Sequence, residues 1–179
     1  MDSRSPSRRA DWNAKVIERP ALTPDDVVLL EGTSCDGVFF ATPTNYFATV
    51  TALKADGFEQ CLDVCGVDYL EHPDRALPEG IAPTRFEIVA NFLSLSKVKR
   101  VRVRVQAGND APQVDSLFAL YPSVEGAERE AFDMFGILFD GHPDLTRILM
   151  PDDWEGHPLR KDYGTGRVPV QFKEGPGPR

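Results

Sequence analysis

Residues 99–106, with the sequence KRVRVRVQ, restrict the fold of this 179-residue chain more than any other stretch. Three valines alternate with three arginines: Val101, Val103 and Val105 against Arg100, Arg102 and Arg104. Because successive side chains of a strand point to opposite faces of a sheet, this pattern predicts a β-strand with one apolar and one charged face. The chain must therefore build a sheet that buries the valine face.

Other segments supply strands to pair with this one. Residues 85–95, RFEIVANFLSL, alternate with Phe86, Ile88, Ala90 and Phe92 on one face, and the short Ser-Lys connection predicts a hairpin with residues 99–106. Further strand candidates are residues 27–32, 37–41 and 61–70, the last with Gly66 as a possible bulge.

The first predicted helix lies within residues 41–57. Thr42 can cap it, and Pro43 suits the first helical position. Phe47, Val50 and Leu53 share one face, and Gly57 supplies a left-handed end. Residues 72–83 are predicted to form a loop, because proline and glycine interrupt them.

The second predicted helix begins at a Ser123 cap and ends at Gly136, with one or two helical turns before it in residues 115–122. Its apolar side chains at helical spacing are Val124, Ala127, Ala131 and Met134 or Phe135. Together these elements predict an α+β fold, a small mixed or antiparallel sheet with helices packed on it.

Three regions are expected along the chain: a disordered basic arm (1–12), the α+β domain (13–138) and a long irregular C-terminal extension (139–179). The extension lacks periodicity, yet it is rich in large apolar side chains, which disordered tails lack. These are Phe139, Leu145, Ile148, Leu149, Met150, Trp154, Leu159 and Tyr163. Ordering each residue costs ~1–2 kcal/mol. We therefore expect another subunit to order it, with Arg147, Arg160, Lys161 and Asp162 in ion pairs.

Composition narrows the function classes. The net charge of −8 and the pI near 4.9 argue against a nucleic-acid partner. No apolar run approaches the roughly 18 residues of a membrane span, so membrane contact is expected only through a complex. The N-terminus has no apolar segment typical of a secretory signal. Three cysteines without such a signal indicate a reducing, cytoplasmic setting.

Several patterns leave chemical alternatives open. The arginine stripe could bind phosphate or pair with acidic side chains, and the excess of acids favours pairing. Cys61 and Cys65 lack both the usual zinc spacing and a second pair, and the chain has no cysteine set for an iron–sulfur cluster and no phosphate loop. We therefore expect this chain to bind no metal and no cofactor.

Histidines and acids in the last third offer a catalytic alternative. His142 and His157, each within Gly-His-Pro, could serve a stand-alone metal-dependent hydrolase or could be rigid turns that pin the chain. Glu130 and Asp133 lie one helical turn apart and could exchange protons or form a solvated face. Arg129 can pair with Asp133 along the helix. We expect no catalytic residues in the isolated chain.

A run of about 36 residues resembles a known family. The pattern Glu-Arg-Glu, Asp-Met-Phe-Gly, Gly-His-Pro-Asp-Leu, Arg-Ile-Leu and Gly-His-Pro-Leu-Arg-Lys-Asp-Tyr is similar to the signature of the 30 kDa-type C subunit of respiratory complex I. The residues that carry it, together with Trp154, are Glu128, Arg129, Glu130, Asp133, Gly136, Gly141, His142, Pro143, Asp144, Arg147, Gly156, His157, Pro158, Arg160, Lys161 and Asp162.

The resemblance implies a non-redox structural subunit of the peripheral arm of proton-translocating NADH–quinone oxidoreductase, on the cytoplasmic side of the membrane. It implies that FMN, the iron–sulfur clusters and quinone belong to other subunits, and that the partners are subunits D, B and I. The signature residues would then form the partner interface. The equivalent subunit of a membrane-bound hydrogenase, or of a dehydrogenase with another electron donor, is the near alternative.

Overall fold

The computed structural model describes residues 27–28 and 35–164. The predicted arm of residues 1–12, residues 29–32 of the first strand candidate and residues 165–179 of the extension lie outside the described residues. The elements are β1 (Val27–Val28), β2 (Gly37–Ala41), α1 (Tyr46–Ala55), β3 (Gln60–Asp68), β4 (Phe86–Ser94), β5 (Lys99–Gly108), β6 (Gln113–Asp115), the 3₁₀ helix η2 (Pro122–Val124), α2 (Glu125–Phe135) and β7 (Leu138–Asp140).

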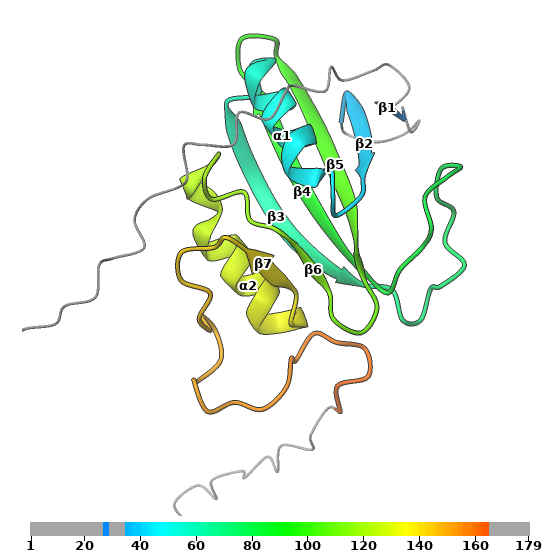
Figure 1. Ribbon diagram of the computed structural model, residues 1–179, viewed down its shortest axis with the longest axis vertical. Helices are drawn as coiled ribbons and strands as arrows, with labels where there is room; N and C mark the ends of the chain where they lie inside the picture. The colour runs from blue at the N-terminus through cyan, green and yellow to red at the C-terminus, as the bar shows by residue number, and fades with distance from the viewer. Residues whose placement is uncertain (1–26, 29–34, 165–179) are drawn as a thin grey trace, which may run out of the picture.

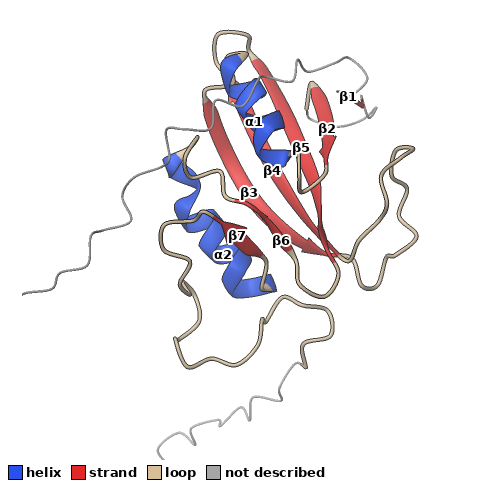
Figure 2. Ribbon diagram, in the orientation of Figure 1, coloured by secondary structure: helices blue, strands red, loops and turns tan. Residues whose placement is uncertain are grey.

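A five-stranded sheet in the order β1-β2-β5-β4-β3 forms the body of the described chain (Figures 1 and 2). β5 pairs with β2 in parallel and with β4 in an antiparallel hairpin, and β3 is an edge strand. A separate parallel pair joins β6 to β7. The sheet is therefore mixed and carries helices, which confirms the predicted α+β class and the hairpin.

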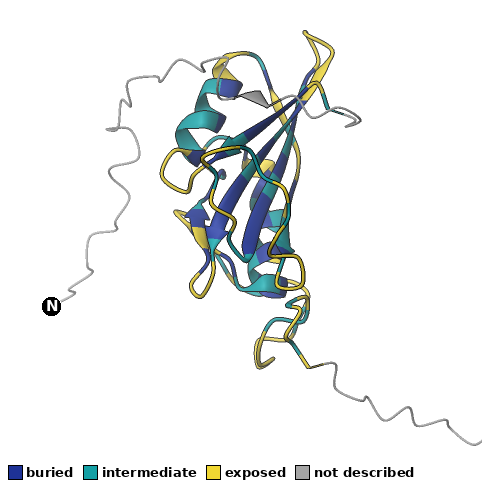
Figure 3. Cartoon of the chain, turned by 90° about the vertical axis from the view of Figure 1, so that its right-hand side faces the viewer, coloured by how far each residue is buried: buried dark blue, intermediate teal, exposed yellow. Residues whose placement is uncertain are grey.

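The strand register divides the sheet into two faces. On the inner face, Val64 lies opposite Ala90, which lies opposite Val103, and all are buried (dark blue strands in Figure 3). The apolar face of α1, with Val50 and Leu53, belongs to the same core cluster. The predicted alternation of β4 and β5 is confirmed, because every expected core residue of these strands is at most 5% exposed.

The outer face carries the arginine stripe. Arg104 forms an ion pair with the buried Glu87 of β4 at 2.6 Å, and the Nε of Arg102 donates to Asn91 Oδ1 at 2.9 Å. Arg104 and Arg102 thus bind polar side chains of the neighbouring strand β4.

Helix α1 begins later than the sequence predicted. Thr42 and Pro43 precede the helix and form a turn in which Asn45 Oδ1 accepts the N–H of Thr42 at 2.7 Å. Asn45 is the N-cap residue, so α1 starts at Tyr46. Its end is as predicted, because Gly57 follows with a φ of +91°.

Gly66 has a different role from the predicted bulge. The irregularity in the β3–β4 register lies between Cys61 and Asp63 instead. A Cβ on Gly66 would lie 2.7 Å from the Phe135 ring, so glycine at this position lets α2 pack closely against β3. Ser123 was also assigned wrongly as a cap, because it lies in η2 and Val124 is the N-cap of α2.

Residues 115–122 contain the end of β6, one turn with helical hydrogen bonds and Pro122, the first residue of η2, so the predicted helical turns are confirmed in part. Here the N–H groups of Leu120 and Tyr121 both donate to the carbonyl of Leu117. None of the helices within residues 35–164 is long and apolar enough to cross a membrane.

Candidate docking site on the C-terminal extension

The extension folds back onto its own domain. From β7 it runs along α2 and then returns past the C-terminal end of this helix, as the orange segment in Figure 1 shows. Residues 141–164 contain no helix or strand, as predicted, whereas Phe139 and Asp140, which were also assigned to the irregular extension, lie in β7. Specific hydrogen bonds and ion pairs attach residues 141–164 to the domain. Two acids anchor these contacts, Asp133 in α2 and Asp68 in β3.

Asp133 is the centre of the first contact. Its fully buried side chain accepts the backbone N–H groups of Ile148, Leu149 and Met150 at 3.1, 2.8 and 2.8 Å, all on Oδ2. Oδ1 pairs with the guanidinium of Arg147 at 2.5 Å. Burial alone would raise the pKa of this carboxyl, but the backbone donors and Arg147 outweigh burial and lower its pKa to about 2.

Arg147 fixes the loop that follows it. One terminal nitrogen binds Asp133, and the other donates to the carbonyls of Trp154 and Gly156 at 2.9 and 3.0 Å. The planar guanidinium presents its donors in a rigid geometry, so it sets the shape of residues 147–156 and attaches them to α2. The expected ion pair of Arg147 is therefore present, but its partner lies in the same chain.

The extension also caps the C-terminal end of α2. The last carbonyls of a helix have no partner inside the helix. Here the carbonyl of Asp133 contacts His157 Nδ1 at 2.9 Å, that of Met134 accepts from the Leu159 N–H at 3.0 Å, and that of Phe135 accepts from Arg160 Nε at 2.6 Å. The second Gly-His-Pro turn is thus a helix cap supplied from a distance.

Gly136 makes this cap possible. It ends α2, as predicted, with a φ of +72°. A Cβ at this position would lie 2.5 Å from Arg160 and from His157. Both the backbone conformation and the close approach of the cap therefore require glycine.

Arg85 connects Asp162 of the extension to the sheet. Its guanidinium binds the buried Asp68 at 3.0 and 2.8 Å and Asp162 at 2.9 and 2.6 Å. Asp68 also accepts the Lys161 N–H at 2.9 Å. Burial opposes ionisation of Asp68, but these donors, with the Leu70 N–H, outweigh it and lower its pKa.

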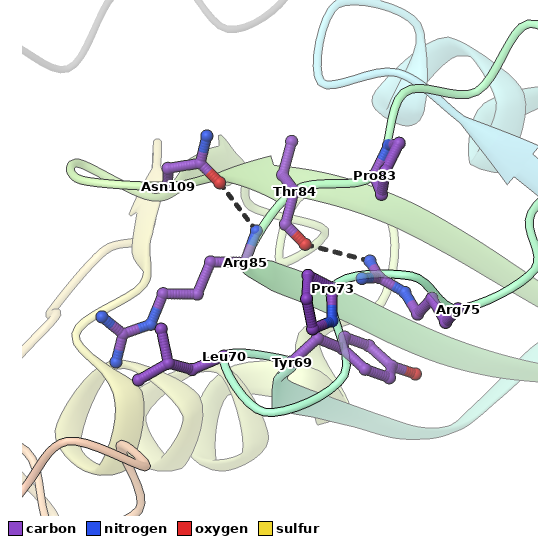
Figure 4. Close-up of a pocket in the computed structure, with 8 residues that line it drawn as sticks. All are labelled: Tyr69, Leu70, Pro73, Arg75, Pro83, Thr84, Arg85 and Asn109. Atoms are coloured by element: carbon purple, nitrogen blue, oxygen red, sulfur yellow. Dashed lines mark hydrogen bonds between the residues drawn. The ribbon is translucent and has the colours of Figure 1, made fainter.

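A pocket of about 200 Å³ opens beside Arg85 (Figure 4). It lies between the loop that follows β3 and the start of β4, and Arg75 stacks over the Tyr69 ring on one side, 3.7 Å from the ring centroid. The other lining residues are Leu70, Pro73, Pro83, Thr84 and Asn109. No signature residue lines this pocket.

Arg129 and Glu128 of α2 form contacts near the start of this helix. Arg129 pairs with Glu125 at 3.0 Å and donates to the carbonyls of Thr146 and Arg147. It does not pair with Asp133 as predicted, because Arg147 occupies that carboxylate. Glu128 is buried and binds Ser116 and Leu117, whereas Glu130 is exposed, so Glu130 and Asp133 do not share a site.

The two histidines lie at opposite ends of α2. His142 contacts the carbonyl of Glu125 at 3.2 Å, and His157 contacts that of Asp133 at 2.9 Å. Eight helical residues rise about 12 Å. This separation argues against a hydrolase that uses both imidazoles on one ion, and residues 35–164 contain no cluster of three metal-binding side chains.

Within residues 141–164, four large apolar side chains are exposed. Ile148, Leu149, Trp154 and Leu159 are 44%, 56%, 42% and 50% exposed. Their backbone is fixed by the contacts of Asp133, Arg147 and the α2 cap, so each of these side chains is exposed from an ordered backbone. We call these four side chains the apolar rim.

Some residues of the domain bind the extension or the first turns of α2 and were not predicted from the sequence. Asp68, Arg85 and Ser116 belong to no motif, and only the fold brings them to their partners. These partners are Lys161, Asp162 and Glu128, which lie 93, 77 and 12 residues away along the chain. The expectation that another subunit provides the ion pairs is corrected for Arg147 and Asp162. The role of the signature residues in a partner interface stays a prediction.

The model of one protein family, described as "Respiratory-chain NADH dehydrogenase, 30 Kd subunit", matches residues 39–168. This match covers most of the sheet, α2 and the extension to six residues past Asp162. The chain belongs to this family. The resemblance inferred from the signature residues is thereby confirmed.

Curated relatives agree with the family assignment. The C subunit of NADH-quinone oxidoreductase from Saccharopolyspora erythraea is 49% identical over 116 residues, which are 65% of this chain and 43% of that protein. The protein of the same name from Mycolicibacterium smegmatis is 47% identical over 115 residues, 64% of this chain and 44% of that protein. The matched part thus spans less than half the length of these relatives.

Two solved structures resemble the fold. A trypsin-resistant fragment of Nqo5 is 32% identical with a TM-score of 0.55, covering 61% of this chain and 82% of that one. A chain from the membrane-bound sulfane sulfur reductase, an archaeal respiratory membrane complex, is 18% identical with a TM-score of 0.66, covering 85% and 89%. The second likeness concerns the fold alone.

Proposed function

We propose that this protein is a non-redox structural subunit of the peripheral arm of a proton-translocating NADH–quinone oxidoreductase. It supports electron transfer from NADH to quinone without binding FMN, an iron–sulfur cluster or quinone itself. Its partners are subunits D, B and I, on the cytoplasmic side of the membrane. Family membership and the relatives named as the C subunit of NADH-quinone oxidoreductase support the assignment to this type of complex.

The apolar rim is the observation that carries the proposed docking role. The loop is fixed to the buried Asp133 of α2, and it exposes Leu149 and Trp154. These apolar side chains are therefore available to another protein. Because its own chain already holds the loop, association loses less conformational entropy than the ordering of a free tail would. The rim therefore fits an apolar surface on a neighbouring subunit.

The test is a pull-down of the tagged protein from its native membranes in mild detergent, followed by mass spectrometry. Recovery of subunits B, D and I together with the NADH-binding subunits supports the proposal. Recovery with hydrogenase subunits would mean that the complex takes its electrons from a donor other than NADH, and the docking role would stand. A chain recovered alone would contradict the proposal.

A matched pair of variants tests the rim itself. Trp154→Ala removes an exposed ring from the rim, whereas Leu62→Ala removes an apolar side chain of similar exposure, 44%, from the β3 edge. We expect Trp154→Ala to lower recovery of the other subunits and Leu62→Ala to leave it unchanged. Equal recovery with both variants would place the docking surface elsewhere.

A further inference from the structure

Glu128 is a buried carboxyl group whose close partners are uncharged. Its side chain is 0% exposed, Oε2 lies 2.5 Å from Ser116 Oγ, and Oε1 accepts the Leu117 N–H at 2.7 Å. Among the residues that the structure describes, no lysine or arginine forms an ion pair with it. Burial raises the pKa of Glu128 to about 7 despite the opposing effect of the two hydrogen bonds.

The nearest group that can carry a positive charge is the imidazole of His142. Its side chain is also fully buried, and Nε2 lies 4.0 Å from Glu128 Oε2. His142 Nδ1 accepts the Asp144 N–H at 3.1 Å, so in this geometry Nε2 carries the proton and donates to the Glu125 carbonyl at 3.2 Å.

The other groups that face Glu128 cannot compensate its charge. Tyr46 of α1 and Cys61 of β3 lie close enough for its charge to help raise their pKa values, after the larger effect of burial. The buried Tyr46 hydroxyl has no hydrogen-bond partner among the described residues. On α2 itself, Arg129 is paired with Glu125. Ionisation of Glu128 therefore places a negative charge among neutral groups.

We propose that Glu128 and His142 form a proton-dependent latch that fixes the root of the extension, residues 141–144, to α2. When Glu128 holds its proton, the buried cluster is neutral and the root is closed. When that proton leaves to solvent, the buried carboxylate favours the entry of water between α2 and residues 141–144. Water entry disrupts the bond between His142 and Asp144 and opens the root.

The direction of the pH effect follows from linkage. A carboxyl group whose pKa is raised on folding binds its proton more tightly in the folded state. The stabilisation that the Glu128 proton gives to the closed root is therefore complete below the unfolded pKa of 4.5. It is lost as the pH rises through the folded pKa of about 7. At the other end of α2 the pKa of Asp133 is lowered to about 2, so that contact stays intact over the same range. Opening is thus confined to the root.

The experiment measures amide hydrogen exchange by NMR on the full chain from pH 5.5 to 8.5, corrected for the intrinsic pH dependence of exchange. Protection of the Asp144 amide is expected to fall by up to about tenfold per pH unit as the pH rises toward 7, and to level off above 7. The Leu149 amide, bound to Asp133, is the internal reference and should keep its protection. Protection of Asp144 that does not depend on pH would overturn the latch.

Variants separate Glu128 from its neighbours. Glu128→Gln has no proton to lose, so Asp144 should stay protected throughout the range. Glu130→Gln, on the exposed side of the same helix, should keep the wild-type profile. If Glu128→Gln fails to fold, ¹³C NMR of the wild-type Glu128 carboxyl decides: a midpoint near 7 supports the latch, and one near 4.5 contradicts it.

Discussion

The sheet domain and the extension are built in opposite ways. The domain buries apolar side chains such as Phe92 and Val103, both 0% exposed, and the outer face of its sheet carries the arginines of β5. The extension anchors to a buried charge, Asp133, and exposes Leu149 and Trp154. A region that turns its apolar side chains outward while polar contacts fix its backbone is suited to bind a second protein. The same contrast predicts that variants in the two regions fail differently.

The largest effect is expected from the core. Phe92→Ala removes a fully buried ring that packs against Tyr121 at a centroid distance of 5.4 Å. Such a deletion costs about 3–5 kcal/mol. We expect chemical denaturation to show a loss of this size for the whole domain, with the extension released at the same time. A loss confined to the extension would contradict the division into two regions.

A comparable but local effect is expected from Asp133→Asn. This variant keeps the shape of the side chain but leaves the Arg147 guanidinium without its carboxylate, and breaking a buried pair costs about 3–5 kcal/mol. Hydrogen exchange should show faster exchange in residues 147–156 and an unchanged sheet. Asp152→Asn, in the same loop but exposed, is the control and should have no effect.

A smaller effect is expected from Gly136→Ala. The new Cβ would meet His157 and Arg160 at 2.5 Å, and the residue would retain a positive φ. We expect a loss of about 1–3 kcal/mol, the usual cost of such a backbone conformation in a non-glycine residue, visible as increased exchange of the Leu159 amide. Gly164→Ala, where a Cβ meets nothing within 4 Å, should leave exchange unchanged.

The smallest effect on stability is expected at the apolar rim. Leu149→Ser removes an apolar side chain that is 56% exposed, and surface changes of this kind usually alter stability by no more than about 0.5 kcal/mol. The variant should fold like the wild type and yet recover less of the other subunits from membranes. A large loss of stability would show that Leu149 belongs to the core of the chain rather than to a docking surface.

Local patterns predicted the domain well. The alternation of β4 and β5 was sufficient because a strand shows its buried face in every second residue. The start of α1 could not be read from the sequence, because Thr42 and Asn45 are both residue types that cap helices. The side chain of Asn45 instead binds the Thr42 N–H in the turn before the helix.

Contacts between distant residues could not be predicted in the same way. The sequence around Asp133 does not indicate that its carboxylate accepts the three N–H groups of residues 148–150. From the sequence, an acceptor on a partner subunit was equally compatible with these amides. The alternative in which the two Gly-His-Pro turns pin the chain is confirmed, because each histidine contacts a backbone carbonyl of α2. These contact partners could not be predicted, because every residue has a backbone carbonyl and the sequence does not distinguish one from another.

The central claim is that this chain itself holds its extension in place. The most direct test is amide hydrogen exchange of Ile148, Leu149 and Met150 in the purified full chain, without any partner. We predict clear protection of all three amides, because each donates to the buried Asp133 carboxylate. Exchange at the rate of an unfolded peptide would mean that another subunit orders the extension, and it would contradict the claim.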